Sequence, residues 1–430
     1  MERTHIKQIK EKSGSTVCIK GFIHTVRDQG SIKFLILRDA TGLCQVVITK
    51  GAKEVFDAVS GLSLESVVSI TGLVKAMPQA PGGFEVEASA IEVLSKAAPE
   101  LPIPVVTEKG GEETDVTLRL DWRSLDLRKP ERKNIFKVWT SLEKGFREYF
   151  YQNDFYQLYS PAFMSTASES GAEVFEVNYF DRKAYLAQSP QFYKQMAMSS
   201  GFEKVFMVGP VFRAEPSYTT RHMTEFTGWD FEVSYIESHY DVMSVVEDAF
   251  ISGFKKVSEE TEVEVIVPTK PFPKISMTEA KRKLQAAGVK SEKEHDISPE
   301  EERELCRLIK EETGSDFVFI TDYHKDVRAF YHMRHGEKNE LTKSFDLLYK
   351  GLEVVTGAQR EHRYDILVSQ AEDRGMPAES LEDYFNFFKY GCPPHGGVGI
   401  GPGRIVMKIL DLASVKEATF LPRDVKRLRP

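Results

Sequence analysis

The chain has 430 residues and a mass of 48.8 kDa, which predicts two or three domains and excludes a small disulfide-stapled scaffold. Hydrophobic residues make up 41% and charged residues 28% of the sequence, a composition typical of a globular protein and not of a disordered or collagen-like chain. The net charge of −8 argues against a protein that coats nucleic acid by bulk charge, although it leaves room for a local basic surface.

The four cysteines have neither the spacing of a metal site nor that of a disulfide framework. We interpret Cys18, Cys44, Cys306 and Cys392 as free, buried thiols in a reducing compartment. The first residues lack the apolar core of a signal peptide, and no stretch approaches about 18 apolar residues. We therefore expect a cytoplasmic protein with no membrane partner.

Residues 16–94 contain short apolar segments separated by glycine-containing turns, a pattern typical of a small β-barrel. One helix is expected at 52–59, between the third and fourth strands, which is the layout of the oligonucleotide-binding (OB) barrel. We assign residues 1–98 to this five-stranded barrel. The expected strands cover 17–23, 32–37, 43–48, 67–70 and 84–87.

The composition changes after the barrel. Residues 99–104 contain three prolines and are soon followed by Gly110 and Gly111, so we assign 99–128 to a linker or hinge. Residues 129–430 then form a larger second domain, which makes the chain a multidomain α+β protein.

The second domain is expected to open with a helix over 130–151, because a proline suits the first turn and apolar residues recur at helical spacing. A strand at 155–159, a strand–loop–strand unit at 205–235 and a helix at 241–257 follow. Two further helices come next, and the second begins at the capping box Ser298-Pro299-Glu300-Glu301.

The densest polar cluster lies at 211–226, between two apolar strands, and contains Arg213, Glu215, Arg221, His222 and Phe226. Guanidinium groups bind phosphate oxygens in pairs, a neighbouring carboxylate fixes their orientation, and an aromatic ring stacks on a base. The cluster therefore suggests a nucleotide site. Taken alone, it is equally compatible with a surface ion-pair cluster on a hairpin.

A second candidate segment is the glycine-rich strand at 396–401, which leads into a helix that begins with Arg404. Glycines allow a ligand to approach the backbone closely. A dinucleotide-binding fingerprint is disfavoured, because that motif follows the first strand of a βαβ unit, whereas these glycines come late in the chain and are followed by Pro402.

Three segments together resemble the signature sequences of class II aminoacyl-tRNA synthetases. They are the helix and strand that end at Pro161, Phe-Arg-x-Glu at 212–215, and Gly-x-Gly-x-x-Arg at 399–404. The resemblance covers nearly the whole chain. The barrel is similar to the anticodon-binding domain of the aspartate, asparagine and lysine subgroup, and the remainder to its catalytic antiparallel sheet flanked by helices.

Within this subgroup the sequence is most similar to the aspartyl-tRNA synthetases of the archaeal and eukaryotic type. Residues 188–195 resemble their Gln-Ser-Pro-Gln-x-Tyr-Lys-Gln, and residues 357–362 resemble their Gly-Ala/Ser-Gln-Arg-x-His. Residues 169–175 are similar to a mobile loop that closes over the amino acid, and 390–397 to the approach to the third signature.

The amino-acid pocket follows from the chemistry of L-aspartate and from the resemblance. A small carboxylate calls for fixed cations, for which we assign Lys194 and Arg360. The resemblance implies acceptors for the ammonium group of the substrate. These are Glu169, Gln191 and Asp230, with Thr356 in the same pocket.

The resemblance also implies how ATP, as a substrate, and Mg²⁺ bind. Arg213 contacts the α-phosphate, Arg404 and His222 the γ-phosphate, and Phe226 stacks on adenine, with Arg213 and Arg404 as the catalytic pair. Glu215, Arg221 and Glu353 belong to the same ATP site, and Asp346 and Glu353 are the metal carboxylates. Catalysis then consists of positioning and charge neutralisation during in-line attack, without a protein nucleophile.

One position departs from the pattern of this family. An acidic residue usually precedes the arginine of the third signature, whereas here Gly403 precedes Arg404, so another acid must orient the arginine. The isolated His239 and His324 are interpreted as structural or surface residues with satisfied hydrogen bonds.

In the barrel, Phe34, Gln45 and Arg27 combine an aromatic face with polar groups, as a reader of unstacked anticodon bases requires. The alternative is a core aromatic residue beside surface polar groups. In related enzymes a Trp and a Lys mark those restricted to tRNA-Asp, and a His and a Pro mark those that also charge tRNA-Asn. These positions align with His24 and Pro81, which predicts a non-discriminating enzyme.

Several alternatives remain at this stage. They are a discriminating enzyme that charges only tRNA-Asp, an asparaginyl-tRNA synthetase, a tRNA-independent relative that makes asparagine, and a non-catalytic tRNA-binding paralogue. The retained arginines disfavour the last, and the barrel disfavours the third. The resemblance further implies a homodimer and, if tRNA-Asn is charged, a functional link to an amidotransferase that converts Asp-tRNA-Asn.

Overall fold

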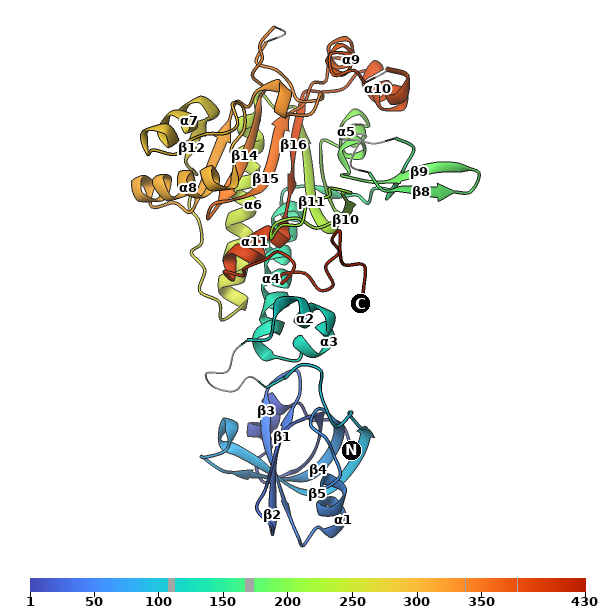
Figure 1. The fold of residues 1–430 in the computed structure, drawn as a ribbon, viewed down its shortest axis with the longest axis vertical. Helices are drawn as coiled ribbons and strands as arrows, with labels where there is room; N and C mark the ends of the chain where they lie inside the picture. Colours follow the sequence, from blue (N-terminus) through green and yellow to red (C-terminus); the bar gives the residue numbers. More distant parts are fainter. Residues whose placement is uncertain (107–112, 167–173, 337, 377) are drawn as a thin grey trace. The chain divides into compact units, whose positions relative to one another are not determined.

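The computed structural model describes residues 1–106, 113–166, 174–336, 338–376 and 378–430 (Figure 1). The chain forms two compact units, Met1–Asp115 and Val116–Pro430. None of the helices in the described ranges is long and apolar enough to cross a membrane.

The first unit is a closed five-stranded barrel, as the sequence predicts. Its strands are joined in the order β1-β2-β3-β5-β4, and the expected helix, α1 (Lys53–Val59), lies between β3 and β4 in the chain. Along β2, Leu35 and Leu37 are fully buried while Phe34 and Ile36 are partly exposed, because side chains alternate between the two faces of a strand. The strands are β1 (Thr16–Asp28), β2 (Ile32–Arg38), β3 (Leu43–Thr49), β4 (Val67–Ala76) and β5 (Phe84–Ser95).

The second unit is built on an eight-stranded sheet with the order β12-β13-β14-β15-β16-β11-β10-β6. The neighbouring strands from β13 to β10 pair antiparallel, as expected. At the two edges, β12 pairs with β13 and β6 pairs with β10 in parallel, so the predicted antiparallel sheet has a parallel pair at each edge. The strands are β6 (Tyr156–Gln157), β10 (Lys204–Phe212), β11 (Glu225–Ser234), β12 (Lys274–Ser276), β13 (Phe317–Thr321), β14 (Ser344–Tyr349), β15 (Leu352–Gln359) and β16 (His395–Ile400).

The strand expected at 155–159 is only two residues long as β6, because the edge position provides one neighbour and pairing is limited to Val205 and Phe206 of β10. A separate three-stranded sheet has the order β7 (Phe163–Met164), β9 (Arg182–Leu186), β8 (Glu176–Tyr179).

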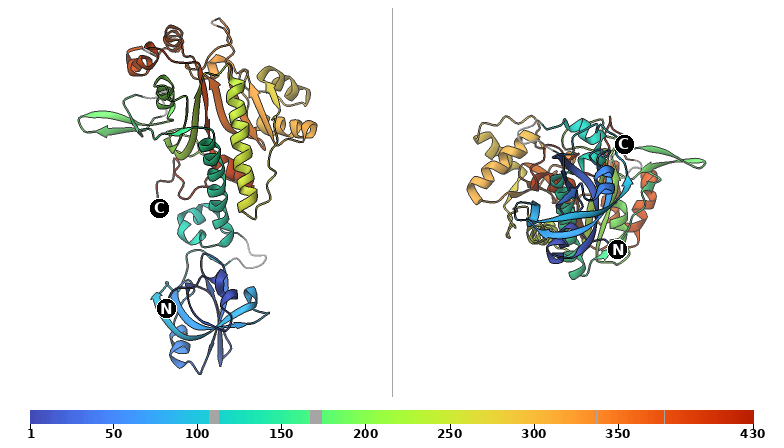
Figure 2. Two further views of the ribbon diagram at one scale, coloured as in Figure 1. Left: turned by 180° about the vertical axis from the view of Figure 1, so that it is seen from behind. Right: turned by 90° about the horizontal axis from the view of Figure 1, so that it is seen from below.

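The long helices α4 (Pro130–Gln152) and α6 (His239–Glu260) lie side by side against one face of the large sheet, as Figure 2 shows from behind. They approach closely at Gly145, where a Cβ atom would lie 2.5 Å from the carbonyl oxygen of Ser252. Both helices and the expected apolar positions of α4 are confirmed. The buried positions of α4 include Ile135, Val138, Leu142 and Phe146.

The second unit also contains shorter helices. The two expected before the later strands are α7 (Met277–Ala286) and α8 (Pro299–Thr313), and the Ser298 capping box is present at the start of α8. Arg404 lies in the first turn of α11 (Pro402–Ile409). The others are α2 (Val116–Asp121), α3 (Arg123–Asp126), α5 (Gln191–Ser199), α9 (Tyr364–Glu372) and α10 (Glu382–Lys389).

Candidate active site

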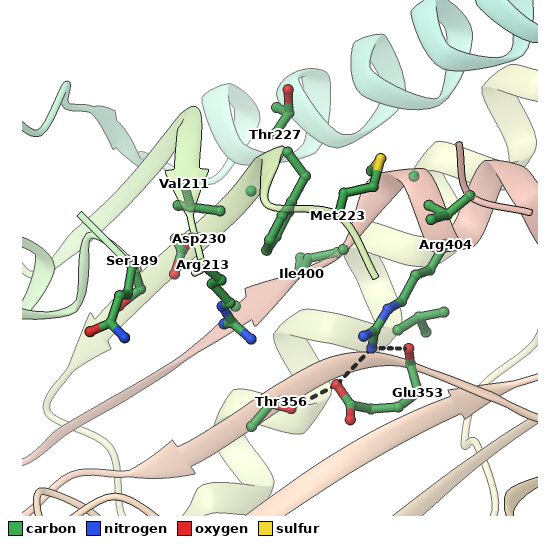
Figure 3. Close-up of a pocket in the computed structure, with 18 of the residues that line it drawn as sticks. Ser189, Val211, Arg213, Met223, Thr227, Asp230, Glu353, Thr356, Ile400 and Arg404 are labelled. Carbon is green, nitrogen blue, oxygen red and sulfur yellow. Dashed lines mark hydrogen bonds and ion pairs between the residues drawn. The ribbon is translucent and has the colours of Figure 1, made fainter. Parts of the chain in front are cut away.

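A cavity of about 720 Å³ lies in the second unit, between α4, the central strands and the start of α11. It gathers most of the candidate residues for amino-acid and ATP binding, and Figure 3 shows the guanidinium groups of Arg213 and Arg404 directed into the same space. Glu169 lies outside the described residues. The candidates that line the cavity are Gln191, Lys194, Arg213, Glu215, Arg221, His222, Phe226, Asp230, Glu353, Thr356, Arg360 and Arg404.

The predicted amino-acid end of the cavity contains a buried network of charges. Lys194 of α5 donates to Asp230 Oδ2 at 2.8 Å and to the carbonyl oxygen of Val398 at 2.9 Å, and its Nζ lies 3.5 Å from Glu232 Oε2. Gln191, one turn earlier, donates to Gln195. Lys194, predicted to contact the substrate side chain, is thus linked directly to Asp230, predicted to contact the ammonium group.

Arg360, at the end of β15, is held on three sides. Its Nε donates to Glu232 Oε1 at 3.0 Å, its Nη2 donates to the Gly397 carbonyl oxygen at 2.9 Å, and its Nη1 lies 2.9 Å from Nε2 of His332. Burial alone would raise the pKa of Glu232, but Arg360 and Lys194 hold that pKa below its usual value. Glu232 is therefore the carboxylate that balances both cations.

The sequence did not lead us to Glu232, although its spacing from Asp230 could have indicated it. Asp230 and Glu232 are two residues apart on β11, so their side chains share one face of the strand. Opposite Glu232 lies Gly397 of β16, where a Cβ atom would lie 2.1 Å from Glu232 Oε2. The glycine-rich strand thus makes room for the carboxylate.

The predicted nucleotide end begins where the pairing of β10 with β11 stops, at Phe212 and Glu225. Arg213 lies over the ring of Phe226, with its Cζ 5.5 Å from the ring centroid, and its Nη1 lies 3.7 Å from Glu215 Oε1. His222 Nδ1 is 2.7 Å from the Thr219 hydroxyl. Burial, followed by the charge of Arg404, lowers the pKa of His222.

Arg221 also lines the cavity, but its Nη1 donates to both carboxylate oxygens of Glu302, at 2.9 and 2.8 Å. Glu302 lies on α8 and is 4% exposed. Burial raises the pKa of Glu302, and Arg221 opposes that shift. This carboxylate, 81 residues further along the chain, carried no signal in the sequence.

Glu353 is the acid that orients Arg404. The Nη1 of Arg404 donates to Glu353 Oε1 at 3.2 Å and to the backbone carbonyl oxygen of Glu353 at 3.0 Å, and Thr356 Oγ1 donates to the same carboxylate at 3.2 Å (Figure 3). Although burial opposes the shift, Arg404 and then Arg328 hold the pKa of Glu353 below its usual value. The acid missing at Gly403 is thus replaced from β15.

Asp346, the other candidate metal ligand, is buried on β14 opposite Thr356 and accepts a hydrogen bond from Arg328 through Oδ2. Its Oδ1 has no hydrogen-bond partner among the described residues. Burial raises the pKa of Asp346, the nearby Glu353 carboxylate adds to the shift, and Arg328 opposes it. Within the described ranges no cluster of three metal-ligating side chains exists, so these two carboxylates suit Mg²⁺ only together with water or phosphate oxygens.

In the barrel unit, Arg27, Phe34 and Gln45 lie on the outer face of three adjacent strands, with Arg27 paired to Phe34 and Gln45 paired to Ile36. Gln45 also donates to Glu85 Oε2 at 2.8 Å. The structure brings these three candidates onto one surface.

His24 occupies an irregularity in the β1–β2 pairing, and its Nδ1 lies 2.7 Å from Nη1 of Arg38. Arg38 in turn makes a two-fold ion pair with the buried Glu65, at 2.9 and 2.7 Å. Pro81 begins the short helix η2 (Pro81–Gly83) before β5.

The family model for "tRNA synthetases class II (D, K and N)" matches residues 115–425, and a model for an "OB-fold nucleic acid binding domain" matches residues 17–94. The chain belongs to the class II aminoacyl-tRNA synthetases. The two matches fall on the two structural units, so this synthetase combines an OB-fold barrel with a class II catalytic sheet.

Curated relatives of this synthetase match along almost their full length. An "Aspartate--tRNA(Asp/Asn) ligase" of Methanopyrus kandleri is 43% identical over 98% of this chain and 97% of its own length. An "Aspartate--tRNA(Asp) ligase" of Pyrococcus abyssi is 40% identical over the whole of both chains. Among solved structures, an asparaginyl-tRNA synthetase of Pyrococcus horikoshii complexed with asparaginyl-adenylate has a TM-score of 0.92 and 33% identity, and covers 100% of both chains.

Proposed function

We propose that this class II synthetase is an aspartyl-tRNA synthetase. It activates L-aspartate with ATP, forms aspartyl-adenylate and pyrophosphate, and transfers aspartate to the 3′ end of tRNA. The observation that carries the proposal is the pair of buried cations, Lys194 and Arg360, at one end of a cavity whose other end holds Arg213 and Arg404. The 40–43% identical relatives named as aspartate ligases support it.

In the first step, the side-chain carboxylate of aspartate binds between Lys194 and Arg360, and Asp230 and Gln191 accept from its ammonium group. Thr356 contributes a hydroxyl to the same end. The family resemblance adds Glu169 as a further acceptor for the ammonium group. A site built on oriented charged partners rejects an analogue that leaves those partners unpaired much more strongly than an apolar pocket does.

The ATP end neutralises charge during in-line attack at the α-phosphorus. Arg213 binds the α-phosphate while Phe226 stacks on adenine, and Arg404 and His222 hold the γ-phosphate end, assisted by Glu215 and Arg221. Glu353 orients Arg404 through the protein's own hydrogen bonds, and a preorganised donor limits reorganisation during the reaction.

Asp346 and Glu353 are proposed to hold Mg²⁺, because one carboxylate oxygen of Asp346 lacks a partner among the described residues and both side chains offer hard oxygen donors. The ion neutralises phosphate charge when bound. The chain's own residues favour the ionised form of Glu353, whose pKa Arg404 and Arg328 lower, whereas Arg328 only partly offsets the burial that raises the pKa of Asp346.

The tRNA is proposed to be both tRNA-Asp and tRNA-Asn. Their anticodons differ in the third base, and His24 with Pro81 stands where restricted enzymes of the family carry Trp and Lys. Phe34, Gln45 and Arg27 would read the shared bases. Asp-tRNA-Asn then requires a separate amidotransferase, which makes that enzyme a functional partner.

The main alternative is an enzyme restricted to tRNA-Asp, since relatives of both kinds match at similar identity. An asparaginyl-tRNA synthetase is the second alternative, because one such structure superposes with a TM-score of 0.92. The sequence Ser189-Pro190-Gln191 and the pair Gln359-Arg360 favour aspartate over asparagine.

We also propose a homodimer. β6 is an edge strand of the large sheet and presents Tyr156, with Phe202 packed against it, as exposed aromatic surface. A cytoplasmic location is proposed because the substrates are ATP and tRNA and the four cysteines are free. The domain boundaries at residues 98 and 128 remain part of the proposal.

The deciding experiment is charging of purified tRNA-Asp and tRNA-Asn transcripts with labelled aspartate and, in parallel, labelled asparagine at one fixed salt concentration. Aspartate on both tRNAs supports the whole proposal. Aspartate on tRNA-Asp alone refutes the relaxed tRNA choice, and asparagine on tRNA-Asn refutes the amino-acid assignment.

A further inference from the structure

Residues 414–427 form no helix and no long strand, yet much of this segment is buried. Val415 is 2% exposed, Glu417 5% and Ala418 0%. Backbone carbonyl groups buried outside regular structure need donors from elsewhere, because an unpaired buried polar group destabilises the fold. For the four consecutive carbonyl groups at 417–420, the donors come from side chains far away in the sequence.

Arg123 of α3 supplies most of them. Its Nη2 donates to the carbonyl oxygens of Glu417 at 2.7 Å and Thr419 at 2.9 Å, and its Nε donates to that of Phe420 at 3.3 Å. Trp139 of α4 donates to the carbonyl oxygen between them, that of Ala418, at 2.6 Å. Four consecutive carbonyls are therefore held by two side chains.

The charge of Arg123 is balanced locally. Its Nη1 donates to Asp126 Oδ2 at 2.7 Å, and neither side chain is more than 1% exposed. Arg119 of α2 pairs with the carboxylate of Glu417 at 2.6 Å, and Arg427 pairs with Asp121 at 2.7 Å. Two ion pairs thus join helix α2 to the 414–427 segment, at Glu417 and at Arg427, while Arg123 of α3 holds it through its backbone carbonyls.

The same segment forms one wall of the active-site cavity, through Val415, Ala418, Thr419 and Phe420. It also forms backbone hydrogen bonds with the loop between β10 and β11, which carries Arg213 and His222. The Val415 amide donates to the Thr220 carbonyl oxygen at 2.9 Å, and the Thr224 amide donates to the Arg423 carbonyl oxygen at 2.9 Å.

We propose that Arg123, which is not one of the residues that line the cavity, is a positioning residue for ATP: it fixes the 414–427 segment, and through it the wall and the loop that receive the nucleotide. Only a guanidinium has the planar, multiple-donor geometry to reach three carbonyls and a carboxylate together. The residues of the predicted amino-acid end lie on α5, β11 and β15. Among the described residues, Arg123 donates no hydrogen bond to any of these elements.

The test compares Arg123→Lys, which keeps the charge and loses the fork, with the full-length wild type. We expect the Kd for ATP with Mg²⁺, measured by calorimetry without amino acid, to rise about tenfold, because small misplacements of binding groups are costly. In aspartate-dependent ATP–pyrophosphate exchange the KM for ATP rises equally, while the KM for aspartate stays within about twofold. Arg427→Met removes the ion pair with Asp121 and should raise the Kd and the KM for ATP about threefold. This variant provides the test if the Arg123 variant does not fold.

Lys281→Met is the matched control. It removes the cation from another nearly fully buried carboxylate, Glu301, in the same unit but away from the cavity. It should lower the melting temperature and leave both KM values unchanged. Unchanged ATP binding in Arg123→Lys, or an equal rise in both KM values, overturns the inference. The exchange assay rests on the proposed function, so wild type without aspartate-dependent exchange would refute that function, while the calorimetric comparison still decides the role of Arg123.

Discussion

Glu353 accepts hydrogen bonds from Arg404 at two places, through its carboxylate at 3.2 Å and through its backbone carbonyl oxygen at 3.0 Å. The arginine is thereby fixed by a residue of β15, and the acid usually found next to it in the chain is unnecessary. Gly403 instead lies against Val415 and Trp139, where a Cβ atom would be 3.1 and 3.7 Å from their nearest atoms.

Restoring the family's acid at this position should therefore fail to improve the enzyme. We expect Gly403→Asp to lower the free energy of unfolding by about 1–3 kcal/mol, because it overpacks a filled contact, and to give no faster ATP–pyrophosphate exchange. Urea unfolding and exchange rates measure both effects. Gly403→Ala, which adds the Cβ without the charge, is the control, and faster exchange in Gly403→Asp would contradict the role assigned to Glu353.

Glu232→Gln should weaken aspartate binding selectively. Arg360 loses the anion that fixes its Nε, and Lys194 loses a neighbouring charge, so we expect the KM for aspartate to rise about tenfold with the KM for ATP nearly constant. Glu361→Gln is a matched control, because Glu361 is a buried carboxylate paired with Arg363 outside the cavity. Equal effects of the two variants on the KM for aspartate would show that Glu232 has no specific role in aspartate binding.

Removal of Mg²⁺ with EDTA should abolish exchange, and added Mg²⁺ should restore it. In Asp346→Asn the Mg²⁺ concentration for half-maximal exchange should rise about tenfold, because one hard oxygen donor loses its charge. Asp316→Asn is the control, because Asp316 is a carboxylate paired with Lys310 and is not a candidate metal ligand. Its exchange activity should depend on Mg²⁺ as that of wild type does. A wild-type Mg²⁺ titration in Asp346→Asn would show that this residue holds no metal.

Acid should destabilise the second unit through His239. This ring is 2% exposed, and neither of its nitrogens has a hydrogen-bond partner among the described residues, so the expectation that its hydrogen bonds are satisfied is wrong. Burial lowers the pKa of His239 to about 4. Since the unfolded histidine protonates below about pH 6.5, stability is fully present above that pH and falls toward pH 4, by about 3 kcal/mol in total.

His239→Phe should flatten this pH dependence, because the ring remains and the titration is removed. Urea unfolding at pH 7 and pH 4.5 measures the difference. Tyr240→Phe changes the neighbouring ring, whose centroid lies 4.2 Å away, and should keep the wild-type slope. An unaltered slope in His239→Phe would assign the acid sensitivity to another group.

The choice of tRNA should depend on His24. A guanidinium only donates, so the His24 Nδ1 facing Arg38 accepts and the proton sits on Nε2. His24→Trp combined with Pro81→Lys should reduce aspartate transfer to tRNA-Asn at least about tenfold relative to tRNA-Asp, with exchange unaffected. His24→Gln keeps an acceptor for Arg38 and should still charge both tRNAs. Equal charging by the double variant would place the discrimination elsewhere.

The sequence predicted those parts of the site that are contiguous in the chain or repeat with a fixed period. The loop from Arg213 to Phe226 and the glycine strand before Arg404 were found in this way, as was the five-stranded barrel. The structure confirms the fold and gathers these residues around one cavity. Their individual roles stay predictions.

Partners distant in sequence could not be predicted. Arg221 and Glu302 are 81 residues apart, and Arg123 lies 294 residues before Glu417, so no local period connects them. The parallel edge pairs were not predicted for the same reason, since the strands that pair there, such as those of Tyr156 and Val205, lie far apart in the chain and parallel strands need a long connection. That the nitrogens of His239 lack partners among the described residues was not predicted, because an isolated histidine in the sequence does not indicate what will surround it.

Gly397 restricts how this enzyme can evolve. Because β16 runs between β11 and β15, a side chain at position 397 would collide with the carbonyl oxygen of Phe231 as well as with Glu232. Glu232, which holds Arg360, therefore keeps its place only while position 397 is glycine. A descendant that binds a different ligand must acquire its preference from residues that line the cavity, such as Lys194 or Arg360, while keeping this glycine.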